Sequence, residues 1–366
     1  MVEKYELDKY MAYRIVNRVR AEARYVVLML MLFTSIISMW ISNTASTSLM
    51  LPLVMKLHDD QNEEVSNFTK ISVLSIAYSA TAGGLGSLLG TTTPAMAVSV
   101  IRKMTGYDIS FVEWCVYGLP ITLLMVLLIW VIVFRMFPTD VKTLSYEETG
   151  ARKLDRDQRL GAGVFLFAVL MWVTAKIPEP VANLVGWSGH GLSTALVAGI
   201  IALALFFFGL LDKDDFRKAK WGTILLIGGS LSLGDAMETS GLSGRIIELL
   251  LPVIRDASSL TVLVLVGFLG LCVSMIASNT ASAGIILPIA VKIGTQTGIS
   301  PVILGIMIGV TTSLDFMLPV GTPPNAIAYS TGKVDMSDMV KAGILLDVIG
   351  VLITVALAYL LWPQLI

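Results

Sequence analysis

The tetrapeptide Ser-Asn-Thr-Ala occurs twice in the chain, at residues 42–45 and 278–281, and each copy interrupts a strongly apolar stretch. The surrounding residues repeat at the same spacing of 236: Ser38 with Ser274, Met39 with Met275, Ser46 with Ser282, Leu51 with Leu287, Pro52 with Pro288 and Lys56 with Lys292. Hydroxyl and carboxamide groups at the depth of a bilayer are tolerated mainly where they line a cavity. The duplication therefore predicts two related halves, each with a polar element inside the membrane.

Composition places the chain in a lipid bilayer. Hydrophobic residues make up 55% of the 366 residues and charged residues only 14%, whereas soluble domains carry about 25% charged residues. Apolar runs of spanning length, roughly 20 residues, recur at 116–137, 192–211, 260–277 and 342–361, with a shorter run at 160–172. Strand alternation of the barrel type is absent. The sequence thus predicts an all-α polytopic membrane protein, multi-pass in the cell (inner) membrane.

Each Ser-Asn-Thr copy lies between two apolar arms, as in a re-entrant hairpin, and a half-helix that ends in a Gly/Pro/Thr-rich break follows it. In the first half the hairpin covers 25–57, the break covers 83–94 and a full span covers 111–137. In the second half the hairpin covers 260–297, a half-helix covers 301–316, the break covers 319–325 and a last span ends near Trp362. Hairpin, broken helix and full span therefore occur twice.

These elements divide the chain into five segments. We expect an interfacial helix at 1–24, the first half of a transport domain at 25–137, a cytoplasmic linker at 138–159, remaining scaffold spans and an interfacial helix at 160–256, and the second half at 257–366. Within the scaffold segment we expect a broken span near 219–236. If the halves are inverted, with the N-terminus inside and the C-terminus outside, 20 of the 26 Lys and Arg fall on cytoplasmic segments. The positive-inside rule supports this inverted repeat.

Two broken hydrophobic segments in corresponding halves are typical of the binding site of a secondary transporter. Unwound backbone offers carbonyl oxygens to a cation such as sodium, and half-helix N-termini offer N–H groups to an anion. The Asn-Thr pairs can both donate to a carboxylate and coordinate a cation. One Ser-Asn-Thr alone would more simply join two helices, but two copies, each paired with a break, favour a site.

Other residues give weaker signals. Asp315 lies at membrane depth beside the second break, where an intramembrane acid suggests a role in coupling; a structural pairing with Lys292 is the alternative. The net charge of −1 and the lack of a basic stripe give no case for nucleic acid. The spacing of the two Cys and two His residues suggests no metal site other than sodium. No catalytic constellation or organic-cofactor motif is evident, so an enzyme is the least favoured class.

The two tips and the run Ser-Leu-Asp-Phe-Met-Leu-Pro-Val-Gly-Thr-Pro-Pro-Asn-Ala-Ile at 313–327 resemble the divalent anion/sodium symporter family, with a departure at Ala328 where Val is usual. The resemblance implies an elevator-type homodimer that couples sodium to a small dicarboxylate or sulfate. It implies that the substrate contacts Asn43, Thr44, Ser278, Asn279, Thr280 and Thr322. It implies sodium sites made by Ser38, Ser42, Asn43 and Gly90, and by Ser274, Ala277, Asn279 and Gly321.

Two departures from the family pattern stand out. In the first break, Pro94 takes the place that Asn325 has in the second. The N-terminal part of the pattern is missing as well, because spans matching 160–236 have no counterpart before residue 1. The function we expect is sodium-coupled symport of C4-dicarboxylates such as succinate, malate or fumarate. Sodium-independent anion exchange and a truncated, non-transporting remnant are the alternatives.

Overall fold

A computed structural model describes residues 22–59, 67–139, 141–142, 155–177, 182–184, 186–218, 221–254 and 256–365. Every regular element in these ranges is a helix, so the predicted all-α class is confirmed. The interfacial helix expected at 1–24 lies almost wholly outside the described residues, as does most of the linker expected at 138–159.

The first half contains the predicted hairpin, broken helix and span. Its helices are α2 (Ala23–Ser38), α3 (Asn43–Asp59), α4 (Asn67–Gly84), α5 (Thr92–Thr105) and α6 (Phe111–Met136). The chain turns between α2 and α3 at residues 39–42, so the first Ser-Asn-Thr forms the hairpin tip. The span α6 begins sharply because the Ser110 hydroxyl and the Glu113 carboxylate each accept a backbone N–H of the other residue, a capping box.

The second half has the same order of elements. Its helices are α13 (Ser259–Ile276), α14 (Asn279–Thr297), α15 (Pro301–Thr311), α16 (Pro323–Ser330) and α17 (Met336–Leu360), with a short 3₁₀ turn at Trp362–Gln364. The half-helix α15 ends before the predicted residue 316. One reason is that the backbone N–H of Phe316 donates to Asp347 Oδ1 at 2.8 Å rather than to a carbonyl of its own helix.

The segment between the halves contains α7 (Arg156–Val173), α9 (Thr194–Phe207), α10 (Lys213–Arg217), α11 (Trp221–Thr239) and α12 (Leu242–Ile254). The prediction of a broken span near 219–236 is wrong, because α11 runs unbroken through Gly228 and Gly229. Glycine lowers helix propensity without removing a backbone hydrogen bond. Both glycines face open space, so no packing contact forces the helix to open there.

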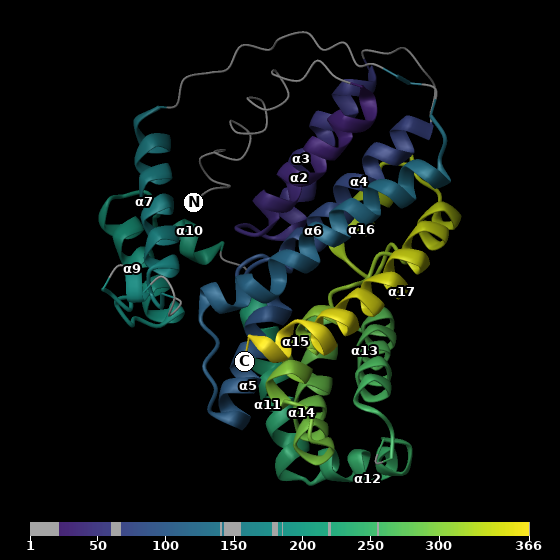
Figure 1. Ribbon diagram of the computed structural model, residues 1–366. Coiled ribbons are helices and arrows are strands. Elements are labelled where there is room, and N and C mark those ends of the chain that lie inside the picture. The colour runs from purple at the N-terminus through teal and green to yellow at the C-terminus, as the bar shows by residue number, and fades with distance from the viewer. Residues whose placement is uncertain are drawn as a thin grey trace.

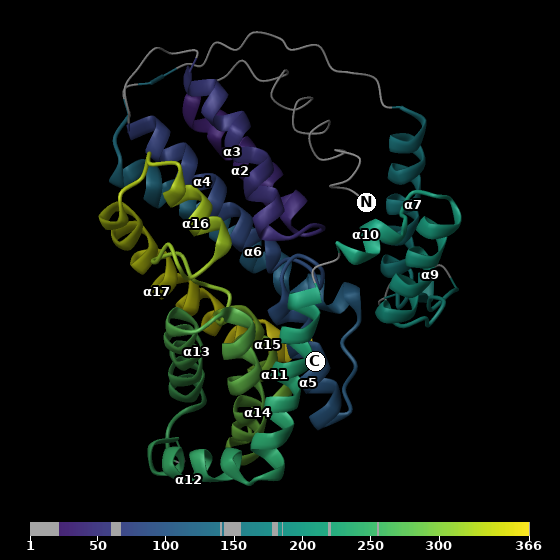
Figure 2. The ribbon, with the colours of Figure 1, turned by 180° about the vertical axis from the view of Figure 1, so that it is seen from behind.

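The two hairpins enter the molecule from opposite ends. In Figure 1, α2 and α3 occupy the upper part and α13 and α14 the lower part, and Figure 2 shows the same arrangement from behind. Each half also contacts the hairpin of the other, since α5 packs on α14 and α15 while α16 packs on α3 and α4. The halves therefore interlock as an inverted pair.

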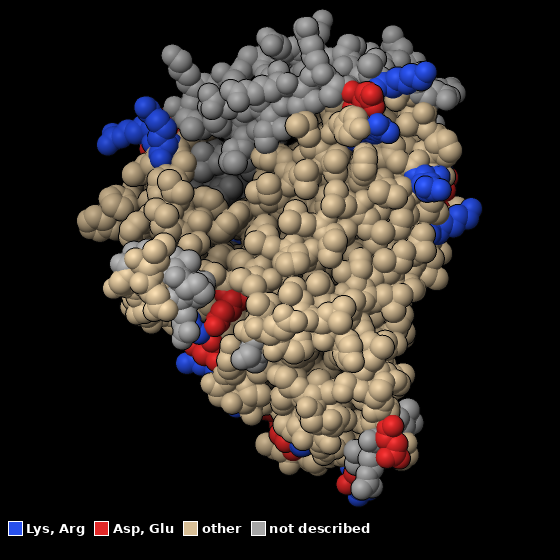
Figure 3. Space-filling model, viewed as in Figure 1, with Lys and Arg blue, Asp and Glu red and all other residues tan. Residues whose placement is uncertain are grey.

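The surface matches this arrangement. Figure 3 shows a broad uncharged face, with Lys, Arg, Asp and Glu at its margins. Three helical segments among the described residues are long and apolar enough to cross a membrane: Phe111–Met136, Ser259–Ile276 and Met336–Gln364. The second of them is α13, so the first arm of the predicted second hairpin has by itself the length of a span.

Candidate functional site

The first hairpin tip forms a cluster of oxygen atoms with the break that follows α4. Ser38 is fully buried at the end of α2; its hydroxyl donates to Ala80 O at 2.7 Å and lies 2.9 Å from the Asn43 carboxamide. Gly90 lies against the same tip, because a side-chain carbon added to it would stand 2.3 Å from Ser38 O. Three of the four residues predicted for the first sodium site are thus brought together: Ser38, Asn43 and Gly90.

The Asn43 carboxamide is surrounded by acceptors. The atom that it turns inward lies 2.9 Å from Ser38 Oγ, 3.2 Å from Gly90 O and 3.3 Å from Ala80 O. With nitrogen turned inward, the amide donates to all three. This is the orientation that satisfies the contacts; with the amide turned over, its oxygen and the three others would form a set that suits a bound cation. Oxygen is the ligand that hard cations prefer, so the atoms of this cluster fit sodium.

The fourth predicted residue, Ser42, has a different local role. Its hydroxyl accepts from Ala45 N at 3.3 Å, so it caps the first turn of α3, and its side chain is half-buried. Thr44 in that same turn is also half-buried. Both residues are therefore at the surface of the tip, beside the oxygen cluster.

The second tip repeats the hydrogen bonds of the first. Ser274 Oγ lies 2.6 Å from Thr312 O and 2.9 Å from the Asn279 carboxamide, as Ser38 Oγ lies 2.7 Å from Ala80 O and 2.9 Å from the Asn43 carboxamide. Ser278 caps α14 by accepting from Ala281 N at 3.3 Å. Ala277 is exposed in an extended conformation, with its N–H donating to Val273 O. The structure thus brings Ser274 and Asn279 together as predicted.

Asn325 bridges two backbone carbonyls of the second break. Its amide nitrogen donates to Asp315 O at 3.1 Å and to Leu318 O at 3.0 Å, and Thr322 Oγ1 caps α16 by accepting from Asn325 N at 3.4 Å. Gly321 lies against the Asp315 carboxylate, because an added side-chain carbon would stand 2.2 Å from Asp315 Oδ2. The first break has Pro94 at the place of this asparagine. There the Ser87 hydroxyl donates to Met39 O of the hairpin tip.

Hydroxyl pairs join the two halves. Thr92 Oγ1, at the start of α5, lies 2.6 Å from Thr280 Oγ1 in the first turn of α14. Thr93 Oγ1 is hydrogen-bonded to Ser313 Oγ just beyond α15. The sequence analysis missed Thr92, Thr93 and Ser313. The signal that would have found them is the run of three threonines after Gly90, which lies opposite Thr322 and two prolines in the second half.

Helix ends concentrate at these tips and breaks. Four helices begin there, α3, α5, α14 and α16, and four end there, α2, α4, α13 and α15. A helix N-terminus carries a partial positive charge and free N–H groups, and a C-terminus carries a partial negative charge and free carbonyls. The arrangement can therefore hold an anion at the beginnings of helices and cations at the ends, without any arginine.

Asp315, the residue predicted to take part in coupling, does not have the partner that the alternative supposed. Lys292 pairs with Glu238 at 2.7 Å, so it does not pair with Asp315 as the alternative supposed. Asp315 is fully buried, and both carboxylate oxygens lack a hydrogen-bond partner among the described residues. Asp347, which is also buried, holds the N–H of Phe316.

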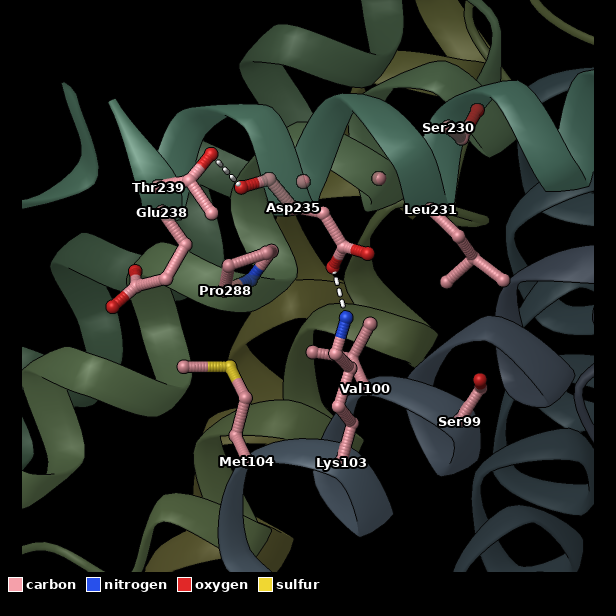
Figure 4. A pocket seen from close by; sticks show the side chains of 12 residues that line it. Ser99, Val100, Lys103, Met104, Ser230, Leu231, Asp235, Glu238, Thr239 and Pro288 are labelled. Carbon is pink, nitrogen blue, oxygen red and sulfur yellow. Dashed lines mark hydrogen bonds and ion pairs between the residues drawn. The ribbon is translucent and has the colours of Figure 1, made fainter. Parts of the chain in front are cut away.

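A cavity of about 420 Å³ lies apart from the tips, between α5, α11 and α14. Figure 4 shows Lys103 and Asp235 paired across it, with Val100, Met104 and Pro288 nearby. None of the predicted substrate or sodium residues lines this cavity. It marks the junction between the two interlocked halves and α11.

The structure combines two inverted hairpins, interlocking broken helices and polar hairpin tips with a broad uncharged surface. These features are those of a multi-pass helical membrane transporter. The chain matches, over residues 1–366, the family described as the sodium:sulfate symporter transmembrane region, and it belongs to that family. The predicted family resemblance is thereby confirmed, as is the expectation that the protein is not an enzyme.

Its relatives are transporters. The chain is 29% identical to the sodium-dependent dicarboxylate transporter SdcS of Staphylococcus saprophyticus, over 99% of this chain and 74% of the relative. It is 32% identical to an uncharacterized transporter of Haemophilus influenzae, over 98% of this chain and 77% of the relative. Its fold is similar to the crystal structure of the YdaH transporter of Alcanivorax borkumensis, with a TM-score of 0.62 at 15% identity, over 98% of this chain and 81% of that one.

Proposed function

We propose that this chain is a sodium-coupled symporter of small divalent anions and that its substrates are C4-dicarboxylates such as succinate, malate or fumarate. The observation that carries the proposal is the cluster at the first tip, where the Asn43 carboxamide, the Ser38 hydroxyl and the Ala80 and Gly90 carbonyls meet in one small volume. Its repetition at Ser274 and Asn279 supports two cation sites rather than one. The named substrate class of the staphylococcal relative is the second support.

The proposed sodium ligands are those of the family resemblance, extended by the carbonyls found here. The first site comprises Ser38, Ser42, Asn43, Gly90 and the Ala80 carbonyl; the second comprises Ser274, Ala277, Asn279, Gly321 and the Thr312 carbonyl. Sodium, when bound, supplies the positive charge that the tips lack. The protein's own contribution is to fix the Asn carboxamides, since each is hydrogen-bonded to a buried serine hydroxyl that also lies within hydrogen-bonding distance of a backbone carbonyl.

The substrate site that we propose lies at the helix beginnings. Hydroxyl, amide and N–H groups there donate to carboxylate oxygens, and neutral donors bind less tightly than arginine, which favours release. The proposed contacts are Asn43, Thr44, Ser278, Asn279, Thr280 and Thr322. The hydrogen bond between Thr92 and Thr280 keeps the second tip beside the start of α5.

We also propose that residues 25–137 and 257–366 move together as the transport domain of an elevator. The support is the interlocking of α5 with α14 and α15 and of α16 with α3 and α4, because a body packed in this way moves as one unit. Residues 160–256 form the remaining scaffold in this proposal, and the protein acts as a homodimer.

The test is uptake of labelled succinate by proteoliposomes that contain the purified chain. We expect uptake to require an inward sodium gradient and to vanish when potassium replaces sodium. Equal rates in both salts together with stimulation by internal succinate would identify an anion exchanger. The absence of uptake under either condition would identify a non-transporting remnant. Competition by unlabelled sulfate and citrate separates C4-dicarboxylates from the other divalent anions.

A further inference from the structure

The two breaks differ at one position that faces a proposed sodium site. Counted back from the break glycines, Gly84 precedes Gly90 by six residues and Asp315 precedes Gly321 by six. Counted from the carbonyls that the tip serines contact, Gly84 is four residues after Ala80 and Asp315 three after Thr312. The packing agrees with the count from the break glycines. A side-chain carbon added to Gly90 would stand 2.7 Å from Gly84 Cα, and one added to Gly321 would stand 2.2 Å from the Asp315 carboxylate.

In the first half this position points directly at the sodium site. A side-chain carbon added to Gly84 would stand 2.2 Å from Asn43 Oδ1, so the glycine leaves the room that the Asn43 carboxamide fills. The second half has the same serine-to-asparagine hydrogen bond, between Ser274 and Asn279. It carries a carboxylate where the first half has no side chain.

That carboxylate needs a partner that the described protein does not supply. Asp315 is 0% exposed, and neither oxygen has a hydrogen-bond partner or an ion pair among the described residues. The Asn325 amide donates to the backbone oxygen of Asp315, not to its carboxylate, and leaves its own Oδ1 buried without a partner. A buried charge without a counter-ion is strongly unfavourable. The carboxylate lies against Gly321, a residue of the second proposed sodium site.

We propose that the Asp315 carboxylate is a direct ligand of the second sodium ion, an inference that rests on the proposed function. The two sites are then unequal. The first is neutral and binds sodium through carbonyl, hydroxyl and amide oxygens alone. The second contains one full negative charge in a water-poor environment, where electrostatic attraction is much stronger than in water. The second site is therefore the tighter one and fills first.

The experiment measures sodium binding without transport. The purified chain is heated in detergent without substrate, in sodium chloride or in potassium chloride of equal ionic strength, and the midpoint of unfolding is followed as sodium is titrated. For Asp315→Asn we expect a higher midpoint than wild type in potassium, because an unpaired buried charge is gone. We expect the half-saturating sodium concentration to rise by at least about tenfold.

The matched control is Asp338→Asn, which removes another acid at the second half but one that pairs with Lys70 at 2.6 Å. This variant should melt earlier than wild type and keep the wild-type sodium dependence. An Asp315→Asn protein that keeps the wild-type half-saturating sodium concentration would overturn the inference. If this protein keeps the wild-type half-saturating sodium concentration and its stability no longer depends on pH, the inference is also overturned, because Asp315 then holds a proton in the wild type.

A second pair of variants keeps the inference testable if Asp315→Asn does not fold. Ser274→Ala should abolish the tighter component of sodium binding and Ser38→Ala should spare it; the opposite order contradicts the inference. Wild-type uptake experiments separate the two proposals. If the wild type imports succinate with sodium but the variants do not change sodium binding as expected, only the proposed role of Asp315 is wrong. If the wild type shows neither sodium-dependent stability nor uptake, the proposed function falls as well.

Discussion

The two hairpin tips share their hydrogen bonds but differ in what covers them. Trp40 in the first tip stacks on Phe111 with ring centroids 5.8 Å apart and meets the edge of Phe165 at 5.6 Å. The residue 236 positions later is Ile276, which is 90% exposed. A duplicated sequence thus reproduces the polar scaffold inside each tip, while the surroundings of the tips diverge. The function of each half depends on both.

The two breaks also differ in the residue that packs on the break glycine. The first break packs glycine on glycine, and the second packs Gly321 on the Asp315 carboxylate. Both arrangements leave no room for another side-chain atom. Variants that probe equivalent positions in the two halves therefore show how far the halves share one mechanism.

The largest effect is expected for alanine at the two break glycines. In Gly90→Ala the new carbon would lie 2.3 Å from Ser38 O, and in Gly321→Ala 2.2 Å from Asp315 Oδ2. We expect sodium-driven succinate uptake to fall about 100-fold in each, the factor given by the upper end of an overpacking cost of ~1–3 kcal/mol. Gly228→Ala, which meets no atom within 4 Å, is the control and should transport normally. Normal uptake by either break variant would contradict the tight packing described here.

The next effect is expected for the two tip asparagines. Asn43→Ala and Asn279→Ala each remove an amide that a buried serine fixes. We expect the half-saturating sodium concentration for uptake to rise about 10- to 100-fold, which corresponds to the ~1.5–3 kcal/mol of a hydrogen bond to a charged group. The comparison sharpens if the two variants differ, because the Asp315 carboxylate compensates for a lost amide only in the second half. Unchanged sodium dependence in both would argue against sodium sites at the tips.

A smaller effect, on stability, is expected for the large side chains at the two tips. Trp40→Ala removes a partly buried ring from the cluster with Phe111 and Phe165, and we expect unfolding to become easier by ~1–3 kcal/mol, less than for a fully buried tryptophan. Ile276→Ala should change the stability by less than ~0.5 kcal/mol, because the side chain is already exposed. Thermal unfolding of the purified variants checks both. Equal losses would show that the second tip is covered as well.

The smallest effect is expected at the contact between the halves. Thr92→Val and Thr280→Val each remove one partner of the 2.6 Å hydroxyl pair. We expect each single variant and the double variant to lose about 1 kcal/mol of stability, so that the second substitution adds nothing to the first. Additive losses, measured by chemical or thermal unfolding, would mean that the two hydroxyls act independently.

Much of the fold could be predicted from the sequence because its signals are local. The duplicated Ser-Asn-Thr, the apolar runs and the Gly/Pro/Thr breaks correctly predicted the order of hairpin, broken helix and span in both halves. The prediction of a broken span failed at α11, which runs unbroken through Gly228 and Gly229. Whether a glycine pair opens a helix depends on its neighbours, and these come from elsewhere in the chain.

For the site as well, the contacts that are local in sequence could be predicted and the contacts between distant segments could not. The family resemblance grouped Ser38 with Asn43 and Ser274 with Asn279 in advance, and the five-residue spacing lets each pair meet without help from distant segments. The fold was needed to show that the Ala80 and Thr312 carbonyls complete these pairs, that Thr92 meets Thr280, and that Lys292 pairs with Glu238 and not with Asp315. These contacts join residues far apart in the chain, and their distances depend on how the two interlocked halves pack.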